Sequence, residues 1–451
     1  MIAPARLAAY ATLRALHTQP IDLPAALARQ RPGLRDERDR SLAADIVIGS
    51  VRWQAALDHV IAWAGNRVLA AFDPEVLDIL RLSAYQLLHL DRVPASAVVS
   101  DAVELTRQQG KASAAGAVNA ILRRVSRDRF HLPMPHSDQA LPYLSITCSH
   151  PRWLAARWLD RLGPDAALAW VRFNNEPAPM TLCANMLCTS RDRLAESLAA
   201  QGVVTTLTAY APDGLVVVEG NPLRTTLAPS GTFLIQSEAS QLVAAFAGIR
   251  PGETVLDACA APGGKTVQMA AALRGSGTLV ACDLRPRRVR LLTDMLRKSG
   301  ADMVAVARVD VLARLPFRPV FDCVLLDAPC SGLGTLRRDP DLRWTRTEDD
   351  LIEFAARQRQ MLNRAAETVR PGGRMVYATC SSEPDENERV VKAFLVEHSD
   401  FTAEDPRDVP SLRLPLGVMA CLDESGCLHP APHIQPLEPF FAARLRKSEQ
   451  V

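Results

Sequence analysis

The sequence predicts a multi-domain protein with an all-helical N-terminal domain, a small α+β module, and a C-terminal α/β domain built on a parallel sheet. Three observations predict this. The chain has 451 residues, enough for two to four domains. Apolar residues recur at helical spacing before about residue 130. After about residue 245, short apolar runs alternate with helical stretches.

The first 130 residues carry helical patterns only. Apolar positions repeat every three or four residues, as in Val76, Leu80, Ala84 and Leu87. Pro94 breaks the chain, and two further amphipathic runs follow at 97–105 and 115–125. Short helices with short breaks are typical of a compact bundle, so we expect a helical domain over residues 1–130. Residues 131–145 contain three prolines and little periodicity, which predicts a linker.

Residues 146–240 are expected to form a connecting α+β module. A helical stretch at 153–173 precedes two strand-like segments, MTLCAN at 180–185 and DGLVVVEG at 213–220.

The last domain, residues 241–451, contains five predicted strands with helical stretches between most of them. The strands are TVLDAC (254–259), TLVACD (278–283), MVAVARVD (303–310), FDCVLLDAP (321–329) and RMVYATC (374–380). Such alternation predicts a parallel sheet with helices on both faces, where ligands bind beyond the carboxyl ends of the strands. Reactive and polar residues gather at those ends, namely Asp257, Asp283, Asp310, Asp327, Cys330 and Cys380.

Composition excludes several classes of protein. No apolar run is long enough to span a bilayer, and arginines interrupt the apolar N-terminus, so we expect a soluble cytoplasmic protein with no membrane partner. Ten cysteines include no C-x-x-C pair, which indicates neither a metal site nor a redox motif. The formal net charge of +2 gives no overall basic footprint for nucleic acid.

Arginines nevertheless cluster in two places. One cluster is Arg123, Arg124, Arg127 and Arg129, and the other is Arg337, Arg338, Arg343 and Arg346. For the first cluster, a solvated helix face is as good an explanation as RNA binding. Near the second, Arg337, Arg338 and Trp344 are candidate RNA contacts.

The first predicted strand runs into a glycine-containing loop, DACAAPGGKT, at 257–266, for which three ligands compete. A dinucleotide would require G-x-G-x-x-G, which is absent. A nucleoside triphosphate would require G-x-x-x-x-G-K-[ST], whose end is matched by Gly264, Lys265 and Thr266, although Cys259 replaces the first glycine. An NTPase therefore remains an alternative.

S-adenosylmethionine fits the loop best. Asp283 closes the second strand, about 20 residues beyond the loop, where a carboxylate could accept hydrogen bonds from both ribose hydroxyls. Asp310 closes the third strand and could hold the adenine amino group. Each aspartate alone could be a strand-end cap, but three at successive strand ends favour a cofactor site.

Cys330 and Cys380 each precede a serine at a strand end. A lone buried cysteine is usually a core residue, whereas two at adjacent strand ends beside a cofactor loop indicate nucleophilic catalysis. A thiolate that adds to carbon 6 of cytosine makes carbon 5 nucleophilic enough to take a methyl group. A carboxylate such as Asp327 could engage the ring nitrogen and exocyclic amine. Spacing alone does not decide which cysteine attacks.

DACAAPGGKT, LLDAPCSGLGTLRRDPDLRW and YATCSSEPDENERVV resemble the motifs of the RNA 5-methylcytosine methyltransferases (the Sun/Nop2 family), over about residues 150–445. The resemblance implies a Rossmann-like class I methyltransferase domain, with Cys380 as nucleophile and Cys330 assisting product release. Asp327 and Lys265 are the other expected catalytic residues. The expected S-adenosylmethionine-binding residues are Cys259, Ala260, Ala261, Pro262, Gly263, Gly264, Lys265, Asp283, Asp310 and Asp327.

The N-terminal segments VIGSVRW, SAYQLLHLDRVP and AVNAILRRV resemble a NusB-like RNA-binding domain, and SHPRWL, NNEPAPMTLCAN and QSEASQLVA resemble the family's connecting module. This combination implies a bacterial enzyme, expected to be monomeric, whose partner is 16S ribosomal RNA and whose target is cytosine 967. Two alternatives remain open: the same chemistry on tRNA or 23S rRNA, and an RNA-binding protein with a silent catalytic fold.

Three positions depart from the family pattern. Cys183 stands where arginine is usual and Ser237 where aspartate is common, and Glu438-Pro439 replaces Asp-Gly before two phenylalanines. We expect Cys183 to weaken an RNA contact and Pro439 to alter how the final strand enters the sheet, because proline lacks a ladder donor.

Overall fold

The computed structural model describes residues 2–449, which divide into two compact units. Within this range, unit 1 comprises residues 2–176 and 338–345, and unit 2 comprises residues 177–337 and 346–449. The chain therefore leaves unit 2 after Arg337, contributes eight residues to unit 1, and returns at Arg346. The helix predicted to open the connecting module also belongs to unit 1 by its packing.

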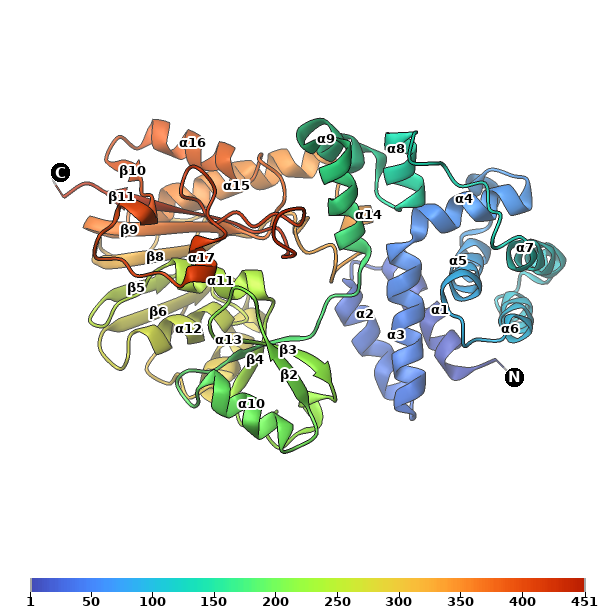
Figure 1. Ribbon diagram of the computed structural model, residues 1–451, viewed down its shortest axis with the longest axis horizontal. Coiled ribbons are helices and arrows are strands. Elements are labelled where there is room, and N and C mark those ends of the chain that lie inside the picture. The colour runs from blue at the N-terminus through green and yellow to red at the C-terminus, as the bar shows by residue number, and fades with distance from the viewer. Residues whose placement is uncertain (1, 450–451) are drawn as a thin grey trace. The chain divides into compact units, whose positions relative to one another are not determined.

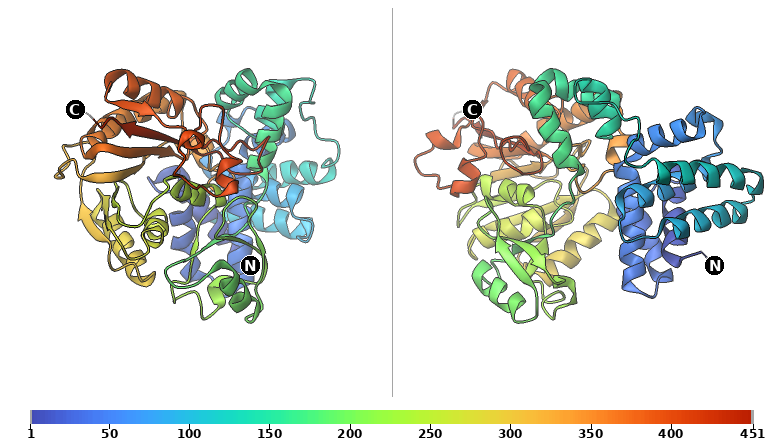
Figure 2. Two further views of the ribbon diagram at one scale, coloured as in Figure 1. Left: turned by 60° about the vertical axis from the view of Figure 1, so that its left-hand side comes forward. Right: turned by 45° about the vertical axis from the view of Figure 1, so that its right-hand side comes forward.

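Unit 1 is helical, as the periodicity predicts, and the blue to teal helices gather into one bundle in both views of Figure 2. Its helices are α1 (Pro4–Thr18), α2 (Leu23–Gln30), α3 (Glu37–Arg52), α4 (Gln54–Gly65), α5 (Pro74–His89), α6 (Ala95–Gln108), α7 (Ala115–Arg127), α8 (Ala140–Pro142), α9 (Arg152–Asn175) and α14 (Leu342–Thr345). The predicted apolar face of α5 is buried in the bundle core. The predicted linker at 131–145 is irregular only to residue 139, because α8 and a π-helical turn at Tyr143–Thr147 follow.

The first sheet of unit 2 belongs to the predicted connecting module. Its four antiparallel strands lie in the order β2-β3-β1-β4. They are β1 (Thr181–Ala184), β2 (Val204–Leu207), β3 (Gly214–Glu219) and β4 (Phe233–Ile235). Helix α10 (Arg191–Ala199) buries Leu194 and Leu198 against Leu182 and Leu215, which face each other across β1 and β3.

The second sheet carries the expected parallel strands, and its order is β10-β11-β9-β8-β5-β6-β7. The five strands predicted from sequence are β5 (Thr254–Asp257), β6 (Thr278–Asp283), β7 (Ala305–Arg308), β8 (Phe321–Asp327) and β9 (Val369–Thr379), all parallel. Antiparallel β11 (Phe441–Lys447) and β10 (Phe401–Ala403) extend the sheet beyond β9.

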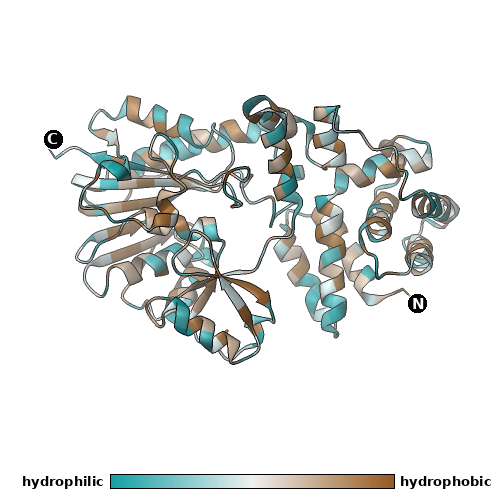
Figure 3. Cartoon of the chain, viewed as in Figure 1, coloured by the Kyte–Doolittle hydropathy of each residue, from teal (hydrophilic) through white to brown (hydrophobic). Residues whose placement is uncertain are grey.

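Helices cover both faces of this sheet (Figure 1), and its strands are largely apolar (Figure 3). Successive strand residues point to opposite faces. One face packs Val255 and Val376 against α11 (Glu238–Phe246), α12 (Gly264–Ala272) and α13 (Pro286–Lys298). The other packs Leu256 and Tyr377 against α15 (Glu348–Ala366) and α16 (Glu388–Glu397). This two-sided cover explains why the strands read as apolar runs.

The expectation for Pro439 is wrong. Strand β11 begins at Phe441, which pairs with Thr379 of β9, so the proline lies outside the ladder and removes no ladder hydrogen bond. Over residues 2–449, no helix is long and apolar enough to cross a membrane.

Candidate active site

The loop after β5 joins the sheet to α12 and has a conformation that requires glycine. Gly263, the residue before α12, has a φ of 111°, in the left-handed region. A Cβ there would also lie 3.0 Å from Cδ1 of Leu292 on α13. The loop therefore packs tightly onto α13 and presents the N-terminal N–H groups of α12 beyond the carboxyl ends of the strands.

Asp257, at the end of β5, is buried, and within residues 2–449 only one of its two carboxyl oxygens accepts a hydrogen bond. Its Oδ2 accepts a hydrogen bond of 2.7 Å from the Thr266 hydroxyl, whereas its buried Oδ1 has no partner among the described residues. Burial is the main cause that raises the pKa of this carboxyl to about 7. The sequence placed Asp257 at the strand end without a role. Its free acceptor oxygen fits a cationic donor such as the ammonium of a methionine moiety.

Asp283 closes β6 as predicted and is tied to the same loop. Its Oδ2 accepts hydrogen bonds from the Ala261 N–H (3.3 Å) and from Nε of Arg288 (3.0 Å). Nη2 of Arg288 in turn donates to the Ala261 carbonyl at 2.6 Å. The carboxylate thus sits beside the loop, and a ribose bound there would share it with Arg288 or displace that arginine.

Asp310 does not end a strand, contrary to expectation. Strand β7 stops at Arg308, and Asp310 is exposed two residues later, where its Oδ1 accepts from the Leu312 N–H at 2.9 Å. The preceding residue, Val309, is bonded to the end of β6, because its N–H donates to the Asp283 carbonyl at 3.1 Å. Asp310 therefore lies on the cofactor side of the sheet, as a turn residue.

Lys265 and Asp327 form an ion pair between the start of α12 and the end of β8. The distance from Nζ of Lys265 to Oδ2 of Asp327 is 2.7 Å. Burial lowers the pKa of the Lys265 ammonium, but the charge and hydrogen bond of Asp327 outweigh it and raise that pKa. The lysine that would bind a phosphate in an NTPase is thus paired with a carboxylate, which does not favour that alternative.

The structure brings Cys330 and Cys380 together at adjacent strand ends. Their Sγ atoms are 3.2 Å apart, although 50 residues separate them in sequence. The hydrogen bond with Cys380, burial and the Glu386 charge raise the pKa of the Cys330 thiol well above its usual range. Cys380 is within electrostatic reach of the Lys265 ammonium. Cys330 is thus held as a neutral thiol, whereas Cys380 has a cation nearby.

Cys259, by contrast, is no candidate for a nucleophile. Burial raises the pKa of its thiol well above the usual range, and the carboxylates of Asp257, Asp327 and Asp283 raise it further. This thiol belongs to the packing of the glycine loop.

Sequence reasoning missed Glu386, which lies in the turn after Cys380. Its side chain is fully buried, and its carboxylate accepts hydrogen bonds from the serine that follows each cysteine, Ser331 and Ser381. A third side chain, Gln358, donates to it at 2.9 Å. Only the YATCSSEPDENERVV motif could have pointed to this residue.

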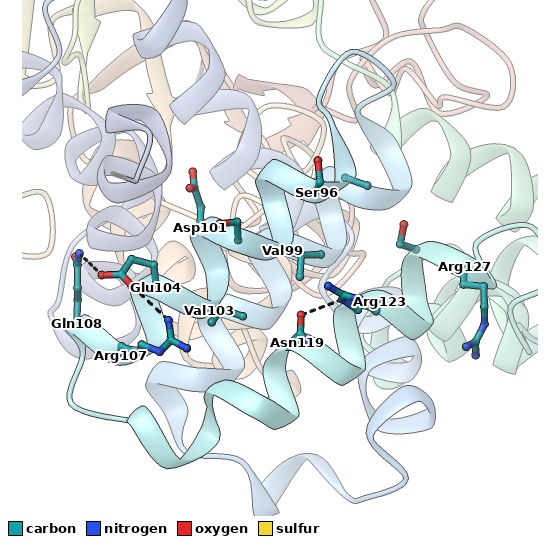
Figure 4. Close-up of a pocket in the computed structure, with 13 residues that line it drawn as sticks. Ser96, Val99, Asp101, Val103, Glu104, Arg107, Gln108, Asn119, Arg123 and Arg127 are labelled. Atoms are coloured by element: carbon teal, nitrogen blue, oxygen red, sulfur yellow. Dashed lines mark hydrogen bonds and ion pairs between the residues drawn. The ribbon is translucent and has the colours of Figure 1, made fainter.

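The first arginine cluster does not act as one surface. The Arg124 guanidinium lies over the Trp63 ring at 4.1 Å, and that of Arg129 lies over the Phe130 ring. Arg127 donates two hydrogen bonds to the Asp128 carboxylate. Arg123 and Arg127 line a pocket of about 700 Å³ between α6 and α7, where Arg123 donates to Asn119 (Figure 4). Arg107, Asp101 and Glu104 line the same pocket, so its charge is mixed.

The second cluster has structural roles that the sequence did not reveal. Arg343 is fully buried in unit 1 and donates to the carbonyls of Arg52, Ser149 and Asn174 and to the Asn175 side chain. Burial lowers the pKa of Arg343 to about 9. The Trp344 indole donates to the Val51 carbonyl at 2.6 Å. The indole N–H is thus occupied within the protein, which counts against the proposed RNA contact by Trp344.

The side chain of Cys183 is completely buried in β1, and the weakening of an RNA contact expected from this cysteine stays a prediction. Ser237 precedes α11 as its N-cap, but its buried hydroxyl makes no capping hydrogen bond. Over residues 2–449, no group of three His, Cys, Asp or Glu side chains is placed to hold a metal ion.

Three family models match the chain. Residues 245–446 match the model described as 16S rRNA methyltransferase RsmB/F, and residues 3–127 match the NusB family. Residues 150–224 match a ferredoxin-like domain of RsmF/B-like methyltransferases.

Relatives align over nearly the whole chain. A probable ribosomal RNA small subunit methyltransferase B of Bacillus subtilis is 33% identical, with 91% of each chain covered. Ribosomal RNA small subunit methyltransferase B of Pseudomonas putida is 34% identical, with 93% of this chain and 95% of the relative covered. The crystal structure of PH0851 matches with a TM-score of 0.81 and 25% identity, covering 99% of both chains. A methyltransferase homologue from Pyrococcus horikoshii, 29% identical, covers 68% of this chain and 99% of its own, with a TM-score of 0.57.

Proposed function

Because this chain belongs to the family of 16S rRNA methyltransferases RsmB/F, which use S-adenosylmethionine, we propose that it methylates carbon 5 of a cytosine through a covalent adduct with Cys380. The observation that carries this proposal is the pair of thiols, 3.2 Å apart, at strand ends beside the Lys265–Asp327 ion pair. Within the described part of the chain, neither thiol belongs to a metal site or a disulfide.

Cys380 would act as the nucleophile. Its thiolate adds to carbon 6 of the cytosine, which makes carbon 5 nucleophilic. S-adenosylmethionine, when bound, supplies the methyl group that carbon 5 takes. Water then takes the proton from carbon 5, and the electron pair of that C–H bond re-forms the double bond to carbon 6 and expels Sγ of Cys380, which releases the methylated base. The Lys265 ammonium lies within electrostatic reach of this cysteine.

Cys330 and Asp327 would assist this cycle. The raised pKa of Cys330 keeps it protonated at neutral pH, so it cannot compete as nucleophile, and its thiol can donate a proton to Sγ of Cys380 as that sulfur leaves carbon 6. Asp327 would hold the ring nitrogen and exocyclic amine of the base, while Lys265 keeps its carboxylate oriented.

The residues of the glycine loop fit S-adenosylmethionine. The free Oδ1 of Asp257 would accept from the amino group of the methionine moiety, and Asp283 would accept from the ribose hydroxyls. The free N–H groups at the start of α12 would point toward the cofactor bound at the glycine loop. Asp310 would reach the adenine from its turn.

We assign small-subunit rRNA as the substrate, with cytosine 967 of 16S rRNA as the target. The support is the near full-length match to small subunit methyltransferases B and the NusB match over 3–127. Unit 1 would bind the RNA backbone, with the pocket between α6 and α7 as one contact (Figure 4).

The test is methyl transfer from tritiated S-adenosylmethionine to unmethylated 16S rRNA, with the labelled nucleotide mapped. We expect the wild type to label one cytosine. Cys380→Ala should be inactive and form no adduct, whereas Cys330→Ala should accumulate a protein–RNA complex that survives denaturation, because release is blocked after attack.

Two results would contradict the proposal. Methylation by Cys380→Ala would remove that residue as nucleophile. Labelling of tRNA or 23S rRNA alone would keep the chemistry and refute the assigned substrate.

A further inference from the structure

A buried carboxylate connects the two cysteine-bearing turns. Ser331 and Ser381, which follow Cys330 and Cys380, both donate their hydroxyls to Oε2 of Glu386. The Ser331 N–H donates to the other oxygen, Oε1, at 2.8 Å. The two hydroxyls are themselves 3.2 Å apart. One side chain thus fixes both turns at the residue after each thiol.

The surroundings of Glu386 hold the carboxylate in place. Gln358 of α15 donates to Oε1 at 2.9 Å and to the Pro329 carbonyl at 3.0 Å, so it also binds the turn that carries Cys330. The fully buried Tyr377 hydroxyl donates to the Glu386 backbone carbonyl. Asn387 donates to the Ser381 carbonyl at 3.0 Å.

Among residues 2–449, no ion pair accounts for this carboxylate. Its four donors there are two hydroxyls, an amide side chain and a backbone N–H. Burial of a charge is expensive unless hydrogen bonds satisfy it, and a structural bridge between two turns could be made with neutral groups. The negative charge therefore points to a purpose in the chemistry of the nearby thiols.

We propose that Glu386 is a positioning residue that fixes the two cysteine turns to each other and keeps the roles of their thiols separate. This rests on the proposed function of Cys330 and Cys380. Its hydrogen bonds hold Cys330 against Cys380, and its charge disfavours a second thiolate at Cys330. Attack by Cys380 and proton transfer by Cys330 then follow from one fixed arrangement. The effect of Glu386 on the Cys330 pKa is consistent with this role.

The first test uses thiol alkylation and needs no RNA. The full-length protein is treated with iodoacetamide at a series of pH values, and modification of each cysteine is followed by peptide mass spectrometry. We expect Glu386→Gln, which keeps the shape and removes the charge, to lower the alkylation midpoint of Cys330 by about one pH unit. An unchanged midpoint would overturn the electrostatic part of the proposal.

Glu404→Gln is the matched control. Glu404 is a partly buried carboxylate of the same unit that accepts from Arg444 and Arg446, and its hydrogen bonds do not involve the cysteine turns. We expect Glu404→Gln to change stability but not the alkylation midpoint of Cys330. An equal midpoint shift in both variants would show a general loss of structure and refute the proposal.

The second test separates positioning from binding. In the methyl transfer assay, Ser381→Ala should lower kcat about tenfold, because the Cys380 turn loses its bond to Glu386, while KM for S-adenosylmethionine changes less than about twofold. Ser381→Ala also serves if Glu386→Gln does not fold. A kcat equal to that of the wild type would refute the positioning role. If the wild type methylates no RNA, the proposed function fails, and the alkylation test still decides the role of Glu386.

Discussion

At the scale of single residues, the buried carboxyl of Asp257 makes a pH-dependent prediction for cofactor binding. Its pKa of about 7 means that only about a tenth of the molecules carry the charge at pH 6, and most carry it at pH 8. If the free Oδ1 accepts from the cationic amino group of S-adenosylmethionine, the ionised form binds better. Affinity should therefore rise about tenfold from pH 6 to pH 8. Isothermal titration calorimetry at several pH values measures this.

Asp257→Asn provides the control, because the amide cannot ionise. This variant should bind S-adenosylmethionine more weakly than the wild type at pH 8, and its affinity should not depend on pH between 6 and 8. A wild-type affinity that is flat over the same range would show that Asp257 does not hold the charged group.

Residue types at strand ends were predictable, but their partners were not. The sequence placed Cys330, Cys380, Asp283 and Asp327 at one edge of the sheet because carboxyl ends of parallel strands share an edge. The role of Glu386 was hidden, since its donors come from segments 5 to 55 residues away in sequence. Contacts between segments that are distant in sequence produce no periodic pattern of residue types, so the sequence does not reveal them.

At the scale of elements, the loop after β8 is fixed where it passes the end of β9. The Gly334 N–H donates to the Cys380 carbonyl at 2.9 Å, and a Cβ on Gly334 would lie 2.1 Å from the Pro439 carbonyl oxygen and 2.7 Å from that of Cys380. Backbone atoms cannot move aside as a side chain can. Pro439 thus matters through this close approach to Gly334, while the ladder begins beyond it.

Gly334→Ala should consequently destabilise the protein by about 1–3 kcal/mol, the usual cost of overpacking, and lower methyl transfer by displacing the Cys380 turn. Urea unfolding followed by fluorescence measures the first effect. Gly116→Ala on α7 is the control, since no described atom lies within 4 Å of its added Cβ and alanine favours a helix. Equal stability of Gly334→Ala and the wild type would mean that the loop can shift without cost.

Helix α7 carries the prediction for RNA binding. Arg123 and Arg127 are exposed and line the pocket between α6 and α7, whereas Arg124 is held on Trp63. Replacing the first two with glutamine should weaken RNA binding. The slope of log affinity against log salt should fall by about one for each phosphate that these side chains no longer neutralise. Filter binding over a salt series measures the slope.

Arg364→Gln, a surface arginine of α15 paired with Glu367, controls for the loss of one positive charge. Its salt slope should equal that of the wild type. If the α7 variants also keep the wild-type slope, the pocket in Figure 4 does not contact phosphates.

Elements were predicted well where their apolar pattern is strong. All five parallel strands were identified. The inner strands β5, β8 and β9 are covered on both faces and therefore have apolar runs, whereas the edge strand β7 has no fully buried residue. The three-residue strands β4 and β10 and the four-residue strand β2 are harder to recognise in the sequence. Short strands give too few alternations to separate from loops.

At the scale of the whole molecule, a short segment inside the catalytic half of the sequence belongs to the helical unit. Residues 338–345 follow the Cys330 loop in sequence but belong to unit 1, where Arg343 satisfies four oxygens contributed by residues 52, 149, 174 and 175. The sequence alone groups Arg343 with Arg337, Arg338 and Arg346 as one basic cluster, because it cannot show that Arg343 is buried. On returning to unit 2, the chain attaches Arg346 to the Ser331 carbonyl at 2.9 Å.

This path predicts that Arg343 keeps residues 338–345 ordered in unit 1. In Arg343→Met, buried carbonyls lose their donors, and each unpaired carbonyl costs about 1–3 kcal/mol. Amide hydrogen exchange of the full-length protein, followed by mass spectrometry, should therefore accelerate in 338–345 while exchange in β5 and β8 stays as in the wild type. Arg6→Met, which removes the ion pair with Asp101 in the same unit, should accelerate α1 and leave 338–345 unchanged. Unaltered exchange of 338–345 in Arg343→Met would mean that the neighbouring Trp344, through its bond to Val51, suffices to hold the segment.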